Sequence, residues 1–276
     1  MIELAQLIRH APGLRKRVRK LRPVKPSKAT EAWYRVELLQ LVDQLDRIAR
    51  AELLPLLQTP AVDRVARAEI STSFQVPRLL ERIAQLARSF GGLQAQADRM
   101  AAQVASRALG DVDKRLSDGI RRSTKVDVTG LLARSERINA TVQAAAKANV
   151  DLITSIPVQH FQRLAVKVEK GFAQGMRSAQ LAKLVQEQTG VTKSRAKLIA
   201  RDQIGKMNSD FSRVRQQDLG ITHYIWRTAQ DERVRDEHAD LDGRTFAWSD
   251  PPSEGHPGMP IQCRCIAEPV FNLDPS

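Results

Sequence analysis

The residues best suited to chemistry lie near the C-terminal end of this 276-residue chain, where both cysteines and two of the five histidines occur. Thiolate and imidazole groups are preferred ligands of zinc, and four of them can complete a tetrahedral site. Cys263 and Cys265 are two positions apart, so on a strand both sulfurs would lie on one face. The sequence therefore predicts a zinc site formed by His238, His256, Cys263 and Cys265.

The spacing of these four residues leaves two interpretations open. Successive residues are 18, 7 and 2 positions apart, which differs from common zinc fingers. In one interpretation, Zn²⁺ is a structural cofactor that braces a module of about 50 residues whose core is too small to be robust alone. In the other, the cysteines are small buried hydrophobic residues and the histidines make ordinary hydrogen bonds.

Many carboxylates lie close to His238 in the sequence. They are Asp231, Glu232, Asp236, Glu237, Asp240 and Asp242. Together with His238 they could form a hydrolytic metal site. However, they alternate with Arg233, Arg235 and Arg244, and such mixtures more often form surface salt bridges. We therefore predict that the protein is not an enzyme and has no catalytic residues, and we keep a metal-dependent nuclease or hydrolase as the alternative.

A small module must position these residues. Aromatic and β-branched residues at 223–227 predict a strand, and a short helix at about 234–241 would carry His238. The Pro/Gly-rich residues 251–260 predict an irregular loop, and residues 263–270 predict a final strand. The mixed composition of residues 221–276 thus differs from that of the preceding chain.

The rest of the chain reads as helical. Aromatic residues make up only 4% of the chain, and the apolar residues recur at helical spacing. The predicted helices are about 30–53, 61–75, 78–90, 93–109, 131–153, 158–174, 178–190 and 192–220. Their breaks are assigned to Pro77, Gly110, Pro157 and Gly190, with a polar loop at 117–130.

These elements define the expected organisation. The fold class is α+β and mainly α, with an elongated helical body followed by a small C-terminal mixed α/β module. The expected segments are a basic N-terminal arm at 1–29, a helical body at 30–176, a helical pair at 177–220 and the mixed module at 221–276.

Positive charge is concentrated at the N-terminus. The chain has a formal net charge of +13, and residues 1–30 hold nine Lys and Arg against one acidic residue. Proline and charge repulsion both oppose packing there, which predicts an extended arm. The arm is either a solvated tail or a contact with DNA or a protein partner. The residues expected to make that contact are Arg15, Lys16, Arg17, Arg19, Lys20 and Arg22.

No apolar run approaches the roughly 20 residues needed to span a bilayer, and no apolar segment follows the basic N-terminus as in a signal peptide. We therefore expect no membrane association.

The order of motifs near the C-terminus resembles the phage Mu F-like minor head proteins, the head-morphogenesis family of tailed phages. The resemblance covers about residues 178–270. The matching residues are Asp231, Arg233, Arg235, His238, Leu241, Asp242, Gly243, Phe246, His256, Pro257, Cys263, Arg264 and Cys265, with Arg201 and Asn208 upstream. Arg235 and His238 stand where other members carry two cysteines, which leaves the ligand set open.

The resemblance implies a structural minor capsid protein that acts in head morphogenesis at the portal vertex or procapsid interior. Portal protein and major capsid or scaffolding protein would be its partners, several copies could be present, and the basic arm could contact packaged DNA. The protein would reside in the virion head after assembly in the host cytoplasm. The alternative function is a metal-dependent nuclease or hydrolase that acts on phage DNA.

Overall fold

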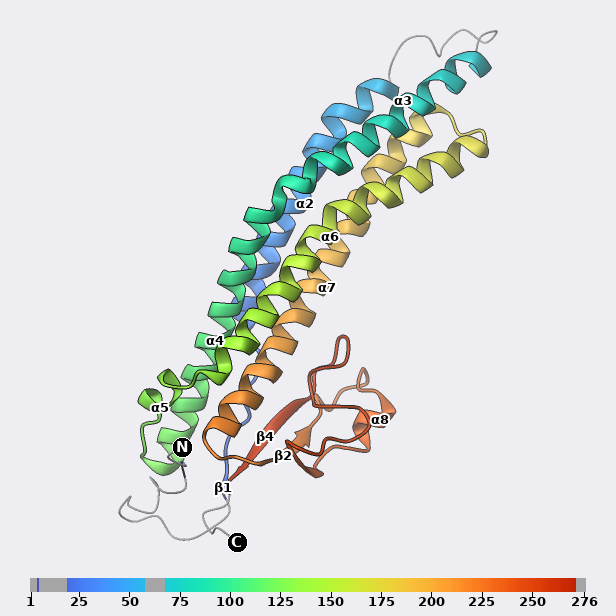
Figure 1. Ribbon diagram of the computed structural model, residues 1–276. Coiled ribbons are helices and arrows are strands. Elements are labelled where there is room, and N and C mark those ends of the chain that lie inside the picture. The colour runs from blue at the N-terminus through green and yellow to red at the C-terminus, as the bar shows by residue number, and fades with distance from the viewer. Residues whose placement is uncertain (1–3, 5–18, 58–67, 272–276) are drawn as a thin grey trace. The chain divides into compact units, whose positions relative to one another are not determined.

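The computed structural model describes residue 4 and residues 19–57 and 68–271 (Figure 1). The predicted contact residues Arg15, Lys16 and Arg17 lie outside the described residues. So do residues 61–67 of the helix predicted at 61–75.

Long helices dominate the described chain, which confirms the mainly α, α+β fold class. The helices are α2 (Lys28–Leu57), α3 (Ala68–Ser89), α4 (Gln94–Thr124), α5 (Thr129–Ala133), α6 (Arg137–Ala173), α7 (Ser178–Asp218) and α8 (Asp236–Ala239), with a 3₁₀ turn η2 (Phe90–Leu93).

The strands form one small antiparallel sheet of order β1-β4-β2-β3. They are β1 (Arg19–Lys20), β2 (His223–Arg227), β3 (Thr245–Ala247) and β4 (Ile266–Phe271). The structure confirms the strand predicted at 223–227 and the irregular loop at 251–260. The final strand begins at Ile266 rather than at Cys263, so both cysteines precede it. The sequence prediction was wrong there, because the chain turns at Pro260–Cys263 before it joins the sheet.

Several predicted helix breaks are wrong. Pro77 lies inside α3 and Pro157 inside α6, while Gly190 lies inside α7. Helix α4 continues through Gly110 and ends at Thr124, inside the predicted polar loop. Glycine inside a helix costs about 1 kcal/mol and proline about 3 kcal/mol. Buried apolar side chains along these helices, such as Val104 and Val112 in α4 and Ile153 and Phe161 in α6, outweigh these local costs.

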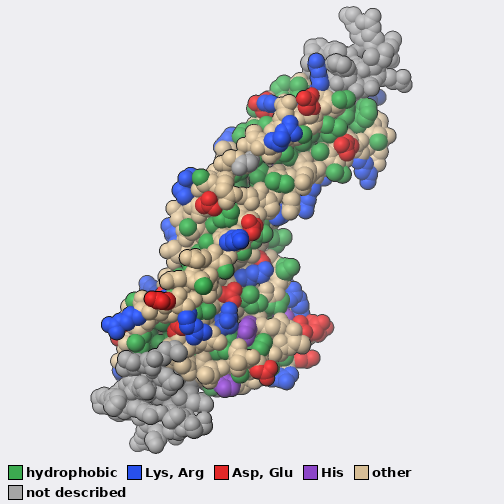
Figure 2. All heavy atoms as spheres, viewed as in Figure 1, with side chains coloured by type: hydrophobic (Ala, Val, Ile, Leu, Met, Phe, Trp, Pro, Cys, Tyr) green, Lys and Arg blue, Asp and Glu red, His purple; other side chains and the backbone are tan. Residues whose placement is uncertain are grey.

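The described chain divides into two compact units, and the division falls within the long helices. One unit comprises residues up to 32, 101–147 and 201 onward, and the other comprises 33–100 and 148–200. Helices α2, α4, α6 and α7 therefore each contribute to both units. On the face shown in Figure 2, Lys and Arg side chains are interspersed with Asp and Glu side chains rather than gathered in one patch.

The first of these units, which carries the sheet, contains an ion pair with a buried arginine and a partly buried aspartate. The Arg215 side chain is only 3% exposed and makes two hydrogen bonds to Asp113 at 2.7 and 2.8 Å. It also donates to the carbonyl of Leu132 at 2.8 Å. The charged residues of this stretch of α7 suggest a solvated face, but Arg215 instead ties α7 to α4 and α5. The sequence of α7 alone could not have predicted these contacts, because the partner residues lie in distant segments of the chain.

Residues 21–27 are packed rather than extended into solvent. Leu21 and Val24 are buried, and β1 pairs with β4. The amide of Asn208 donates to the carbonyl of Val24 at 2.9 Å. The prediction of an unpacked arm is therefore wrong for this stretch, because two apolar side chains among the basic ones find a buried site. Arg22 remains exposed.

The second unit, formed by residues 33–100 and 148–200, buries polar pairs among its helices. The Tyr34 hydroxyl bonds to the Asn149 side chain at 2.9 Å, and His160 Nδ1 lies 2.9 Å from the Thr192 hydroxyl. An unpaired buried polar group is costly, so these pairs restrict which helix faces can meet. Burial lowers the pKa of His160 to about 4.

We predict that His160 makes this protein less stable in mild acid. The unfolded chain, with the ordinary histidine pKa of 6.5, binds more protons than the folded chain between pH 6.5 and 4. The free energy of unfolding therefore falls as pH falls through that window, by at most about 1.4 kcal/mol per pH unit. His160→Asn retains a polar side chain without titrating and should flatten the decline. Urea unfolding at several pH values checks this, and parallel pH curves for both proteins would contradict it.

Candidate metal centre

Two segments of the small module bring three of the predicted ligands together. His238 lies on α8, which follows β2, and the two cysteines lie just before β4, which pairs with β2. Because both segments adjoin neighbouring strands, they meet at the same end of the sheet. Asp231, before α8, accepts a two-pronged pair of hydrogen bonds from Arg264 between the cysteines. This ion pair joins the two segments directly.

The three ligand atoms have the spacing of a zinc site. His238 Nδ1 lies 3.6 Å from Cys263 Sγ and 3.5 Å from Cys265 Sγ, and all three atoms lie within 4.8 Å of one another. With Zn–S near 2.3 Å and Zn–N near 2.0 Å at a tetrahedral angle, sulfur and nitrogen should be about 3.6 Å apart. His238, Cys263 and Cys265 therefore fit a tetrahedral metal ion.

The surroundings favour a thiolate at Cys263. A hydrogen bond from the Cys265 side chain, followed by bonds from the backbone N–H groups of Cys265 and Gly258, lowers the pKa of Cys263 to about 5. The same pairing and burial raise the pKa of the Cys265 thiol. The thiolate is the form that binds metal. Both sulfurs lie beside the His238 ring, so the lowered pKa of Cys263 favours metal binding at this position.

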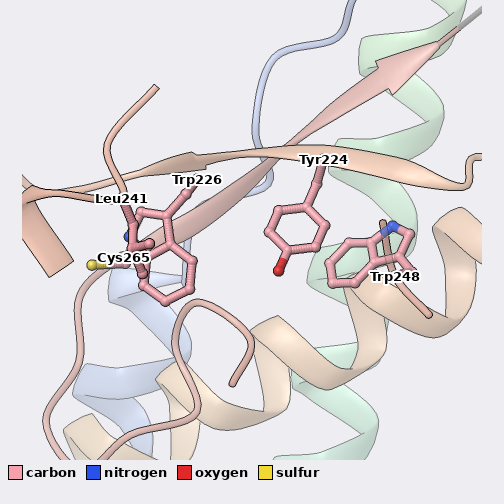
Figure 3. Packing of buried hydrophobic residues seen from close by; sticks show 5 residues of the cluster. All are labelled: Tyr224, Trp226, Leu241, Trp248 and Cys265. Carbon is pink, nitrogen blue, oxygen red and sulfur yellow. The ribbon is translucent and has the colours of Figure 1, made fainter. Parts of the chain in front are cut away.

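An aromatic cluster forms the apolar wall of the site (Figure 3). Tyr224 and Trp226 alternate along β2 and point to the same side, where they pack with Leu241, Trp248 and Cys265. The Trp226 ring meets the His238 ring edge-on, with centroids 5.3 Å apart. His238 is only 3% exposed, and its Nε2 atom has no hydrogen-bond partner among the described residues. Packing rather than a second hydrogen bond therefore orients this ring.

The structure does not bring His256 to this group. Its Nδ1 lies 3.3 Å from the Tyr224 hydroxyl, and its ring packs on Trp248 with centroids 5.1 Å apart. Within the described residues, the group with metal-ligand spacing comprises His238, Cys263 and Cys265 only. The four-residue set predicted from the sequence is thus reduced to three. The loop at 251–260 has no periodicity from which the direction of the His256 side chain could be predicted.

The nearby carboxylates have other roles. Asp231 pairs with Arg264, and Asp242 accepts a hydrogen bond from the backbone N–H of Thr228 at 2.8 Å. Four further acidic side chains are exposed, namely Glu232, Asp236, Glu237 and Asp240. Gly243 follows Asp242 with a φ of 80°, as expected for a turn that ends the short helix.

Helix α7 fixes the segment that carries the cysteines. An Asp202 carboxylate oxygen accepts the backbone N–H of Gln262 at 2.7 Å and so holds Gln262 at a φ of 58°. The Ser209 hydroxyl donates to the carbonyl of Pro257. Neither Asp202 nor Ser209 was singled out in the sequence, because their partners are about 50 residues or more away. The one feature of the sequence that could have pointed to Asp202 is its position next to Arg201, which belongs to the helix motif of the family resemblance.

Gly258 allows the loop to approach α7. Its φ is 88°, and a Cβ atom there would lie 3.0 Å from the Ser209 Cβ. Such a contact is too short to be accommodated without displacement of the loop or the helix. Gly255, in the same loop, also has a positive φ of 75° but no atom within 4 Å of the corresponding position.

We predict that Gly258→Ala destabilises the protein more than Gly255→Ala. Both variants place a side chain in the left-handed region, which costs about 1–2 kcal/mol. Gly258→Ala adds the collision with Ser209, worth a further 1–3 kcal/mol or so. Urea unfolding of both variants measures the difference, and equal losses would show that the close approach does not matter.

Two comparisons with known proteins find matches to this chain. Residues 162–268 match the family described as "Phage Mu protein F like protein". The chain is 32% identical over 264 residues to an uncharacterized protein of Haemophilus influenzae. The aligned region covers 93% of the chain and 56% of that relative. The chain thus spans little more than half the length of the relative it matches. No solved structure matches the chain.

The three metal-ligand candidates therefore lie within a segment that matches a known family. The match of residues 162–268 to the phage Mu protein F-like family confirms the resemblance seen in the motifs of the chain. Among the described helices, none combines the length and the apolar character needed to cross a membrane.

Proposed function

We propose that the protein is a structural minor head protein that acts in the head morphogenesis of a tailed bacteriophage. The match of residues 162–268 to the phage Mu protein F-like family is the observation that carries this proposal. Its partners are portal protein and the major capsid or scaffolding protein, and its place is the virion head, assembled in the host cytoplasm. The long helices supply extended surfaces for such partners, while the sheet module ends the chain in a compact unit.

Production of the full chain together with the portal protein of the same phage tests this function. The two proteins should co-purify, and procapsids that form without this chain should be defective. The result that would overturn the proposal is a chain that is absent from purified heads, combined with normal heads after deletion of its gene.

The metal has a bracing role in this proposal. His238, Cys263 and Cys265 would hold Zn²⁺, which supplies a cross-link between α8 and the segment before β4. The buried apolar cluster of this module centres on five residues, so a cross-link adds stability that such a small core supplies poorly.

We predict that the purified chain contains zinc in a 1:1 ratio. Cys263→Ser/Cys265→Ser and His238→Asn should each lose the metal and melt at a lower temperature, because each removes a ligand. His256→Gln is the matched control: it should keep the metal, since His256 contacts Tyr224 and Trp248 instead. Elemental analysis and thermal melts measure both effects. Loss of zinc in His256→Gln would restore the four-residue set, and full zinc in the double cysteine variant would exclude the site.

Contact with DNA through the basic N-terminus is a further part of the proposal. Arg15, Lys16 and Arg17 lie in the most basic stretch of the sequence. Replacement of all three by glutamine should weaken DNA binding and reduce the slope of log K against log salt by about 3, since each phosphate contact contributes about 0.9. Filter binding at several salt concentrations measures the slope. An unchanged slope would assign DNA contact, if present, to another surface.

One observation favours the alternative, a metal-dependent hydrolase acting on phage DNA. The group supplies three protein ligands, and catalytic zinc sites characteristically leave a fourth position open. Plasmid incubated with the zinc-loaded protein should remain intact if the role is structural. Cleavage that disappears in His238→Asn would establish the hydrolase instead.

A further inference from the structure

A pocket of about 230 Å³ borders the candidate metal centre. All three residues of the His–Cys–Cys group line it, together with Arg201, Arg233, Arg235 and Arg264. No carboxylate is among the residues that line the pocket. Four arginine residues thus line an opening whose wall includes the metal-ligand candidates.

The positive charge of this pocket is only partly neutralised. Arg264 forms an ion pair with Asp231, and Arg233 lies 3.9 Å from the same carboxylate and 4.0 Å from the exposed Glu232. Arg235 donates to the carbonyl of Ile261 at 2.7 Å, which is a neutral acceptor.

Within the described part of the chain, no carboxylate lies within 4 Å of the Arg201 or the Arg235 guanidinium. At least two full positive charges therefore remain available to a ligand in the pocket. These two arginines come from different segments, Arg201 from α7 and Arg235 from the residue before α8. They converge on one pocket only because the module folds against this part of α7.

We propose that this pocket binds a phosphate group, one oxygen of which takes the coordination position that His238, Cys263 and Cys265 leave open on the metal. Guanidinium groups present planar pairs of donors that match phosphate oxygens, and several of them together favour a multiply charged oxyanion. The metal adds a further positive charge at the wall of the same pocket. This inference rests on the proposed metal site but concerns a ligand that a purely bracing role does not require.

Replacement of zinc by Co²⁺ in the full chain gives a direct readout, because the visible absorption of tetrahedral Co²⁺ changes with its fourth ligand. Titration with inorganic phosphate at constant ionic strength should shift these bands and saturate, whereas chloride should not. Arg201→Gln/Arg235→Gln should weaken phosphate binding tenfold or more with unchanged metal content. Arg244→Gln is the matched control, since Arg244 is exposed in the same module, stacks over Phe246 and does not line the pocket.

The outcomes separate the two proposals. If elemental analysis finds no metal in the chain, the bracing site and the metal-bound phosphate both fail. If metal is bound but neither inorganic phosphate nor a short DNA duplex shifts the spectrum, the pocket proposal fails and the bracing site stands. A shift with inorganic phosphate identifies free phosphate as sufficient, and a shift with the duplex alone identifies a nucleic-acid backbone phosphate. If the double arginine variant binds phosphate as tightly as the unaltered chain does, the pocket proposal also fails.

Discussion

The close approach of the loop at 257–262 to helix α7 is the constraint on which the C-terminal module depends. Gly258 lies against Ser209, and Asp202 holds the backbone of Gln262 in a left-handed conformation. These contacts fix where the chain enters Cys263, and hence where both sulfurs lie relative to His238. Without them, the cysteines would sit at the end of an irregular loop with no defined direction.

The module compensates for its small size with several kinds of interaction at one place. The Tyr224, Trp226 and Trp248 rings bury apolar surface, and the Asp231–Arg264 ion pair joins the two ligand-bearing segments. A metal on the three ligand atoms would reinforce the same connection. The bracing role and the arginine-lined pocket are compatible, because three protein ligands would leave a fourth coordination position of the ion for a ligand from the pocket.

The same arrangement explains how the charges near His238 are divided. Arginines converge on the pocket, whereas the acidic side chains pair with Arg264, accept backbone hydrogen bonds or face solvent. A site with this sign of charge suits a phosphate ligand better than a second metal ion. The buried Arg215, paired with the partly buried Asp113, shows that a charge on α7 can equally have a purely structural role.

The sequence by itself determined the mainly helical class, the strand at 223–227, the chemical type of the candidate ligands and the family that residues 162–268 resemble. These follow from local composition, periodicity and the order of motifs. Tertiary structure decided which helices continue through Pro77 and Pro157, because packing summed over many side chains exceeds a local cost of a few kcal/mol. It also decided that His256 joins the aromatic cluster instead of the ligand group, since side-chain direction in a Pro/Gly loop is set only by what the loop packs against.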